Sequence, residues 1–226
     1  MTAVTADDAG NPVDTRQRLL DATATLISRH GFAGTSLQMI ADELGFTKAA
    51  IYYHFPAREQ LLIALMEPIL HQIRRVVETA ESQRTPRTQM DAMVAGFAEV
   101  VAKNRSLAAV VVFDPSVHRV LQEQSEWGDL IVRQLGLLMQ LESDATAGVI
   151  RATALLTGLA GAATGAPPDI DEQSLIEELS GLGRRLMGLR QPRRQTQTQT
   201  EPDEKPTAPK RPLPPPGPWR EFLTEA

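Results

Sequence analysis

The segment around residue 50 gathers side chains that can bind phosphates and base edges. Lys48 contributes an ammonium group, and Tyr52 and Tyr53 contribute phenols shortly after it. Ammonium and hydroxyl groups bind phosphate oxygens, and the methyls of Ala49 and Ala50 can contact thymine methyls in a major groove. These residue types therefore predict a surface that binds double-stranded DNA.

Two short helices are required to position this surface, and the sequence carries start and stop signals for both. Thr35-Ser36-Leu37-Gln38 has the pattern of a capping box, and Gly45 can end the helix that it opens. Thr47 can cap a second helix, in which Ile51 and Phe55 are four residues apart and point into a core. Two short helices joined by a glycine-containing turn predict a helix-turn-helix. The outward face of the second helix then holds Lys48, Ala49, Tyr52 and Tyr53.

A third helix is expected before this pair. It begins at Asp14, whose carboxylate can accept the free N–H groups of the first turn, with Gln17 three residues on. Gly31 can end it, because glycine readily adopts a positive φ. The inward face of this helix holds Leu19, Ala22, Leu26 and Ile27.

The order of these residues resembles the DNA-binding signature of the TetR/AcrR family of regulators. The resemblance is carried by GFAGTSLQMIA at residues 31–41 and GFTKAAIYYHF at residues 45–55. It implies that Thr35 and Ser36 lie on a phosphate at a helix N-terminus, and that Arg58 contacts phosphate at the start of the next helix. The implied recognition surface consists of Lys48, Ala49, Ala50, Tyr52, Tyr53 and His54, and the cap residue Thr47 completes the candidate DNA-binding set.

Pro56 and Ala57 depart from the family pattern, in which a lysine and a serine or threonine cap often occupy these positions. The departure removes one cation and one helix cap, and a lost cap costs on the order of 1 kcal/mol. We therefore expect a softer joint or weaker phosphate binding here, with the fold unchanged.

The composition limits the class of protein. The chain has 226 residues, 42% of them hydrophobic, which is enough for one substantial core or two modest ones. Apolar residues recur at helical spacing from Leu19 to the end of the 180s, which predicts an all-α fold. The lack of cysteine excludes disulfides, thiolate metal sites and cysteine nucleophiles. A net charge of −5 argues against a protein that coats nucleic acid generally, but it permits a local basic face.

Four zones are expected along the chain. They are a disordered leader (1–12), a helix-turn-helix DNA-binding domain (13–57), a helical ligand-binding and dimerisation domain (58–190) and a disordered tail (191–226). The tail contains nine of the sixteen prolines and cannot build a core. The leader is polar and acidic, unlike a secretory signal, and no later stretch reads as long and apolar enough to span a bilayer. We therefore expect a cytoplasmic, nucleoid-associated protein that does not enter a membrane.

The second domain should contain the ligand cavity. Its first helix, from Arg58 to about Thr79, contains Pro68, which predicts a bend that either allows movement or simply fits the core. Further helices should begin at Thr85-Pro86 and Asp114-Pro115. Methionine and aromatic residues suit a flexible apolar cavity and also an ordinary core. The candidate cavity residues are Met66, Leu70, Met93, Phe97, Phe113, Val117, Leu121 and Trp127.

The last two expected helices, over 148–164 and 171–189, have residue patterns that suit close packing against other helices. The first combines leucines with small residues, and the second repeats leucine at Leu175, Leu179, Leu182 and Leu186. The family resemblance implies that residues 148–189 form a four-helix interface in a homodimer. Such a dimer matches a palindromic operator, because both have two-fold symmetry.

These observations predict a dimeric transcriptional regulator. A repressor that is released from operator DNA by a small, largely apolar effector is the first expectation, and an activator is the alternative. No cofactor or metal is expected, because His30, His54, His71 and His118 lack metal-ligand spacing. An enzyme is the first alternative, but no glycine-rich phosphate loop or nucleophile motif is present. An interaction protein is the second, in which residues 209–218 form polyproline II and residues 219–223 fold on a partner.

Overall fold

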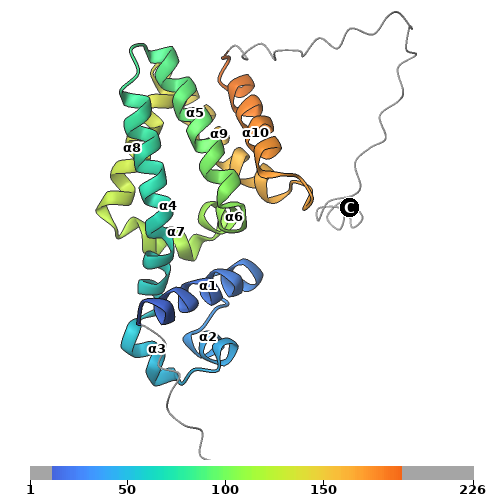
Figure 1. Cartoon of the computed structure of the whole chain (residues 1–226). Helices are drawn as coiled ribbons and strands as arrows, with labels where there is room; N and C mark the ends of the chain where they lie inside the picture. The colour runs from blue at the N-terminus through green and yellow to red at the C-terminus, as the bar shows by residue number, and fades with distance from the viewer. Residues whose placement is uncertain (1–11, 190–226) are drawn as a thin grey trace, which may run out of the picture.

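The computed structural model of the chain describes residues 12–189, and every regular element in that part is an α-helix. This confirms the predicted all-α fold. The helices labelled in Figure 1 are α1 (Pro12–His30), α2 (Leu37–Leu44), α3 (Lys48–His54), α4 (Arg58–Glu81), α5 (Pro86–Lys103), α6 (Arg105–Phe113), α7 (Pro115–Gln122), α8 (Ser125–Met139), α9 (Ala145–Thr164) and α10 (Glu172–Leu186). The predicted disorder of the leader and of the tail, and the alternative function of the tail, concern residues outside this range, apart from Pro12, which begins α1.

Helices α1 to α3 form a small head with a core of its own. Its buried side chains include Leu19, Ala22 and Leu26 from the predicted inward face of α1 and Ile51 and Phe55 from that of α3, together with Leu37 and Ile40 of α2. The start of α1 differs from the prediction: the helix begins at Pro12, so Asp14 lies inside the first turn and is not its cap. Proline suits a first helical turn, because it lacks only an N–H that the helix would not use.

The turns of the head form as the sequence predicts. The Ser36 hydroxyl accepts a hydrogen bond from Met39 N and caps α2, and the Thr47 hydroxyl accepts one from Ala50 N and caps α3. Gly31 and Gly45 have φ values of 69° and 66° at the ends of α1 and α2. In this left-handed region only glycine carries no steric penalty, so these two residues fix where the helices stop.

Helix α4 leaves the head and runs into the body formed by α5 to α10, as Figure 1 shows. The body has a second core, to which α4, α5, α8, α9 and α10 all contribute. Its helices begin at the predicted signals: Thr85 caps α5 with Pro86 in the first turn, and Asp114 caps α7. Two buried residues of the head, Ile27 and Phe32, belong to this second core rather than to the first. The head and the body are therefore joined by shared packing as well as by α4.

Helix α9 contradicts one expectation. The sequence predicts no stretch long and apolar enough to span a bilayer, yet among the described residues this helix of 20 residues meets both conditions, with a mean hydropathy of 1.3. Length and composition alone are weak evidence for a membrane span. Leu155, Leu159 and Ala160 are buried in the body core, and Arg151 forms an ion pair with Glu142. One face of α9 is thus packed as a core helix of the body.

Candidate functional site

The outward face of α3 carries the side chains that the sequence predicts for DNA contact. Ile51 is fully buried and fixes the rotation of the helix. Tyr53 is 85% exposed and Tyr52 is 45% exposed. Lys48, Ala49 and Ala50 are also exposed, and the Lys48 ammonium lies 5.7 Å from the centre of the Tyr52 ring. The helix therefore presents one cation and two phenols with small side chains between them.

A groove of about 410 Å³ lies beside this face. It is lined by Ser36 at the start of α2, by Lys48 and Tyr52 of α3, and by residues 56–59 at the start of α4. The N–H groups of the first turn of a helix attract anions. The groove thus places an ammonium group, a phenol and the N-terminus of α2 around one space, which suits a phosphate of the DNA backbone.

Thr35 does not reach this groove. Its side chain is 1% exposed, and its hydroxyl donates to the carbonyl oxygen of Gly31 at 2.8 Å. Thr35 thus stabilises the turn between α1 and α2, while Ser36 is the hydroxyl residue at the groove. Thr47 is exposed as the cap of α3, and the partly exposed ring of His54 packs edge-on against Tyr53.

Arg58 points into the head. Its Nη1 donates to the carbonyl oxygens of Phe32, Ala33 and Thr35 at 3.0 to 3.3 Å. The guanidinium also lies 4.4 Å from the centre of the Phe32 ring and forms an ion pair with Glu59. As expected from the sequence, α4 has no side-chain cap at Ala57. The first residue of α4 therefore holds the α1–α2 turn in place, and only part of its charge faces the groove.

Asp114 of the body holds the same turn from the other side. Its Oδ2 accepts a hydrogen bond from Phe32 N at 2.9 Å, and its Oδ1 accepts bonds from the amide and hydroxyl of Ser116. Burial alone would raise the pKa of Asp114, but the hydrogen bonds from Ser116, Phe32 and Val117 outweigh it and lower the pKa. The carboxylate is therefore ionised near neutral pH and joins the body to the head.

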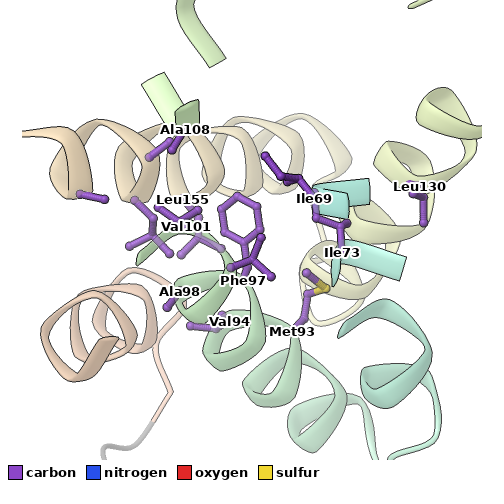
Figure 2. Close-up of a cluster of buried hydrophobic side chains, with 14 of the residues drawn as sticks. Ile69, Ile73, Met93, Val94, Phe97, Ala98, Val101, Ala108, Leu130 and Leu155 are labelled. Carbon is purple, nitrogen blue, oxygen red and sulfur yellow. The ribbon is translucent and has the colours of Figure 1, made fainter. Parts of the chain in front are cut away.

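The hydrogen bond between Asp114 and Phe32, which we call the joint, lies next to an apolar cavity in the body. Asp114 directly follows α6, and α6 packs against α1 (Figure 1). Figure 2 shows Phe97 in the middle of the surrounding cluster, with Ile69 and Ile73 to one side and Val101 to the other. The cavity measures about 50 Å³ and has an entirely apolar exposed surface. Its wall consists of Ile69, Ile73, Phe97, Val100, Val101, Asn104, Ala108, Val111, Val112 and Ala160.

The residues predicted to line a cavity lie in three environments. Phe97 lines the cavity. Met66, Leu70, Met93, Val117 and Leu121 are buried elsewhere in the body core, and Trp127 is half-buried against it. Phe113 is 59% exposed, and its ring lies beside Gly161 of α9. Sequence reasoning missed the β-branched and small residues of the wall, although the apolar run of α6 marked the region.

Comparison with known proteins gives matches that centre on the head. The family model described as "Bacterial regulatory proteins, tetR family" matches residues 19–65. The chain is 29% identical over 111 residues to the HTH-type transcriptional repressor KstR2 of Rhodococcus jostii, covering 49% of this chain and 54% of that protein. It is 37% identical over 65 residues to the HTH-type transcriptional regulator LmrA of Bacillus subtilis, covering 28% of this chain and 35% of that protein. The chain thus spans about half, or less, of the length of these relatives.

Solved structures resemble the chain over a greater length. The ketosteroid transcriptional regulator KstR2 of Mycobacterium tuberculosis superposes with a TM-score of 0.60 at 15% identity, covering 80% of this chain and 96% of that one. A TetR-like transcriptional regulator from Rhodococcus sp. RHA1 gives a TM-score of 0.57 at 24% identity, covering 79% and 99%. At these identities the likeness shows a common fold, including that of the body. The head therefore matches the tetR family of bacterial regulatory proteins over residues 19–65, and the described chain as a whole shares the fold of solved TetR-like regulators.

Proposed function

We propose that this protein is a dimeric transcriptional repressor that binds a palindromic operator and is released by a small effector held in the body. The observation that carries the proposal is the exposed face of α3, with Lys48 and Tyr52 beside the groove at the start of α2. Relatives named as repressors support the direction of regulation. The protein would act in the cytoplasm, at its operator on the nucleoid.

The head would dock with α3 in the major groove. Tyr53, Ala49 and Ala50 would face the bases, and Ser36, Lys48 and Tyr52 would contact the phosphates at the groove edge. Thr47 and His54 flank this surface at the two ends of α3. Thr35 and Arg58 would act indirectly, because their hydrogen bonds fix the turn that sets α2 against α4.

The dimer would form through residues 148–189. Two large apolar side chains of α9, Val149 and Ile150, are 43% and 65% exposed, and Leu186 of α10 is 42% exposed. Between them α9 exposes small residues such as Ala154 and Gly158, which permit close approach of a second helix. A second copy would cover this apolar face, which the monomer leaves in water, and would place two heads on one face of DNA.

Effector binding would act through α6. The cavity of about 50 Å³ is far smaller than the roughly 300 to 1,000 Å³ of typical ligand sites. A ligand can therefore enter only if the walls separate, and α6 contributes Ala108, Val111 and Val112 to them. Movement of α6 shifts Asp114, which holds the head through Phe32. The ligand favours the state released from DNA only to the extent that it binds the widened cavity more tightly than the closed cavity of the DNA-bound state.

Substitutions on α3 test the DNA surface. Lys48→Ala and Tyr52→Ala should each weaken binding to the operator about tenfold, because each removes a phosphate or base-edge contact. Arg119→Ala is the matched control, since Arg119 is an exposed cation of α7 in the body. Fluorescence anisotropy with labelled upstream DNA measures the affinity, and light scattering checks the dimer. Wild-type affinity in both α3 variants would exclude this face as the DNA surface.

A further inference from the structure

A second, polar groove lies on the outer side of α4 and α5. It measures about 580 Å³ and is lined by residues of both helices. The helices come so close here that a Cβ atom at Gly96 would lie 2.6 Å from Val76. The lining residues are Gln72, Arg75, Val76 and Thr79 of α4, Ala92, Gly96, Glu99, Val100 and Lys103 of α5, and Asn104, which follows α5. Polar side chains thus dominate this groove, in contrast to the apolar cavity.

The groove and the apolar cavity share two walls. Val100 and Asn104 line both of them, so the two spaces are neighbours at these residues. Asn104 Nδ2 donates to Gln72 Oε1 at 3.0 Å and to Val100 O at 2.8 Å, which ties the end of α5 to α4. Moving the Asn104 side chain would join the groove to the cavity.

The groove offers a cation to a ligand. Lys103 is already paired with Glu99 at 2.5 Å. Within the part of the chain that the structure describes, no ion pair holds Arg75, whereas Lys103 lies beside the carboxylates of Glu99 and Glu172. An anion bound at Arg75 would give this cation a partner. The Gln72 oxygen accepts from Asn104, which leaves its N–H₂ group to donate to the same anion.

We propose that the effector is an amphipathic anion whose charged head binds at Arg75 in the groove and whose apolar tail passes Asn104 into the cavity. This rests on the proposed function, because it names the chemical class of the effector. The wall of the apolar cavity contains no ionisable side chain, whereas the groove offers the guanidinium of Arg75 to a charged head. A ligand that spans both spaces places its charged head in the groove and its apolar tail in the cavity. The tail breaks the link between Asn104 and Gln72 and moves the α6 wall of the cavity, Ala108, Val111 and Val112, away from Ile69 and Ile73 of α4.

Straight-chain carboxylates from hexanoate to tetradecanoate are suitable probes, with the matching alcohols as uncharged controls. Calorimetric titration of the full chain should show that affinity rises with chain length and that each carboxylate binds more tightly than its alcohol. Arg75→Gln should weaken the binding of dodecanoate about tenfold and leave dodecanol unchanged. Arg119→Gln, which removes an exposed arginine of α7, is the control that should change neither. Ala108→Leu fills the cavity and should weaken the long carboxylates more than hexanoate.

The outcomes separate this inference from the proposed function. If no carboxylate binds, or if Arg75→Gln binds dodecanoate as tightly as the wild type, the inference is overturned, whatever the protein does with DNA. If dodecanoate binds as expected and also releases the protein from upstream DNA, both stand. If dodecanoate binds with the expected dependence on Arg75 but no upstream DNA is bound at any salt concentration, the ligand site stands and the regulatory function fails. The melting temperature of each variant confirms that it is folded.

Discussion

The backbone N–H of Phe32 donates a 2.9 Å hydrogen bond to Oδ2 of Asp114, a residue 82 positions further along the chain. Phe32 belongs to the turn that precedes α2, and Asp114 belongs to the junction of α6 and α7. The carbonyl and the ring of Phe32 are held by Arg58 of α4. Phe32 of the head is therefore held by Arg58 of α4 and by Asp114, which follows α6, and both of these helices also line the cavity.

Asp114→Asn tests this contact. An amide in the same place can keep the cap of α7 through its oxygen, but it then turns an N–H₂ group toward the N–H of Phe32. We expect the free energy of unfolding to fall by about 1 to 3 kcal/mol, the cost of an unsatisfied polar group. Asp144→Asn is the matched control: Asp144 caps α9, bonds only to the adjacent backbone, and asparagine caps equally well. Equal, small losses in chemical denaturation of the two variants would mean that the contact adds no stability.

The same carboxylate predicts a dependence of stability on pH. The folded-state pKa of Asp114 is lowered, so its contribution is present above the pKa of the unfolded chain, about 4, and is lost as the pH falls through the folded-state value. The difference in unfolding free energy between wild type and Asp114→Asn should therefore be constant near neutral pH and shrink below about pH 4. Urea unfolding over a pH series measures it. A difference that persists unchanged in acid would show that ionised Asp114 is not its source.

Substitutions at Gly31 and Gly45, which have nearly the same φ, distinguish the cost of backbone strain from the cost of crowding against Asp114. A Cβ atom at Gly45 would meet nothing within 4 Å, whereas a Cβ atom at Gly31 would lie 3.3 Å from Asp114 Oδ2. Gly45→Ala should cost about 1 to 2 kcal/mol, the penalty of a left-handed conformation. Gly31→Ala should cost more, because it also presses on the carboxylate that holds Phe32. Thermal unfolding compares the two, and equal costs would mean that the joint accommodates the added methyl freely.

Ile150→Glu tests the dimer surface. A carboxylate in the middle of an apolar helix interface would lose its water without gaining a partner, so the variant should become monomeric at concentrations where the wild type is dimeric. Val132→Glu is the control, since Val132 of α8 is 69% exposed and lies outside residues 148–189. Light scattering gives the mass of each. If Ile150→Glu stays dimeric, α9 does not form the interface.

The sequence predicts the head well because its signals are local. Ser36, Gly45 and Thr47 act on the backbone within a few residues, and the four-residue spacing of Ile51 and Phe55 fixes which face of α3 is outward. The predicted start of α1 at Asp14 is two residues late, because Asp14 and Pro12 both suit a first turn.

Longer-range features could not be predicted in this way. Phe32 and Asp114 meet only through the packing of α6 on α1, which no periodicity encodes. Arg58 was expected on a phosphate, and only the fold shows the three carbonyl oxygens that it reaches. The cavity is lined largely by valine, alanine and isoleucine, residue types that fill every core, so its wall cannot be told from ordinary core by residue type.

Binding to DNA tests the central claim most directly. Labelled DNA from the region upstream of the protein's own gene is compared with scrambled DNA by fluorescence anisotropy over a salt series. The account predicts tight binding to the upstream DNA alone, with the logarithm of the affinity falling linearly with the logarithm of salt concentration, because phosphate contacts release counterions. Equal affinity for the two DNAs at every salt concentration would contradict the claim that α3 reads an operator there.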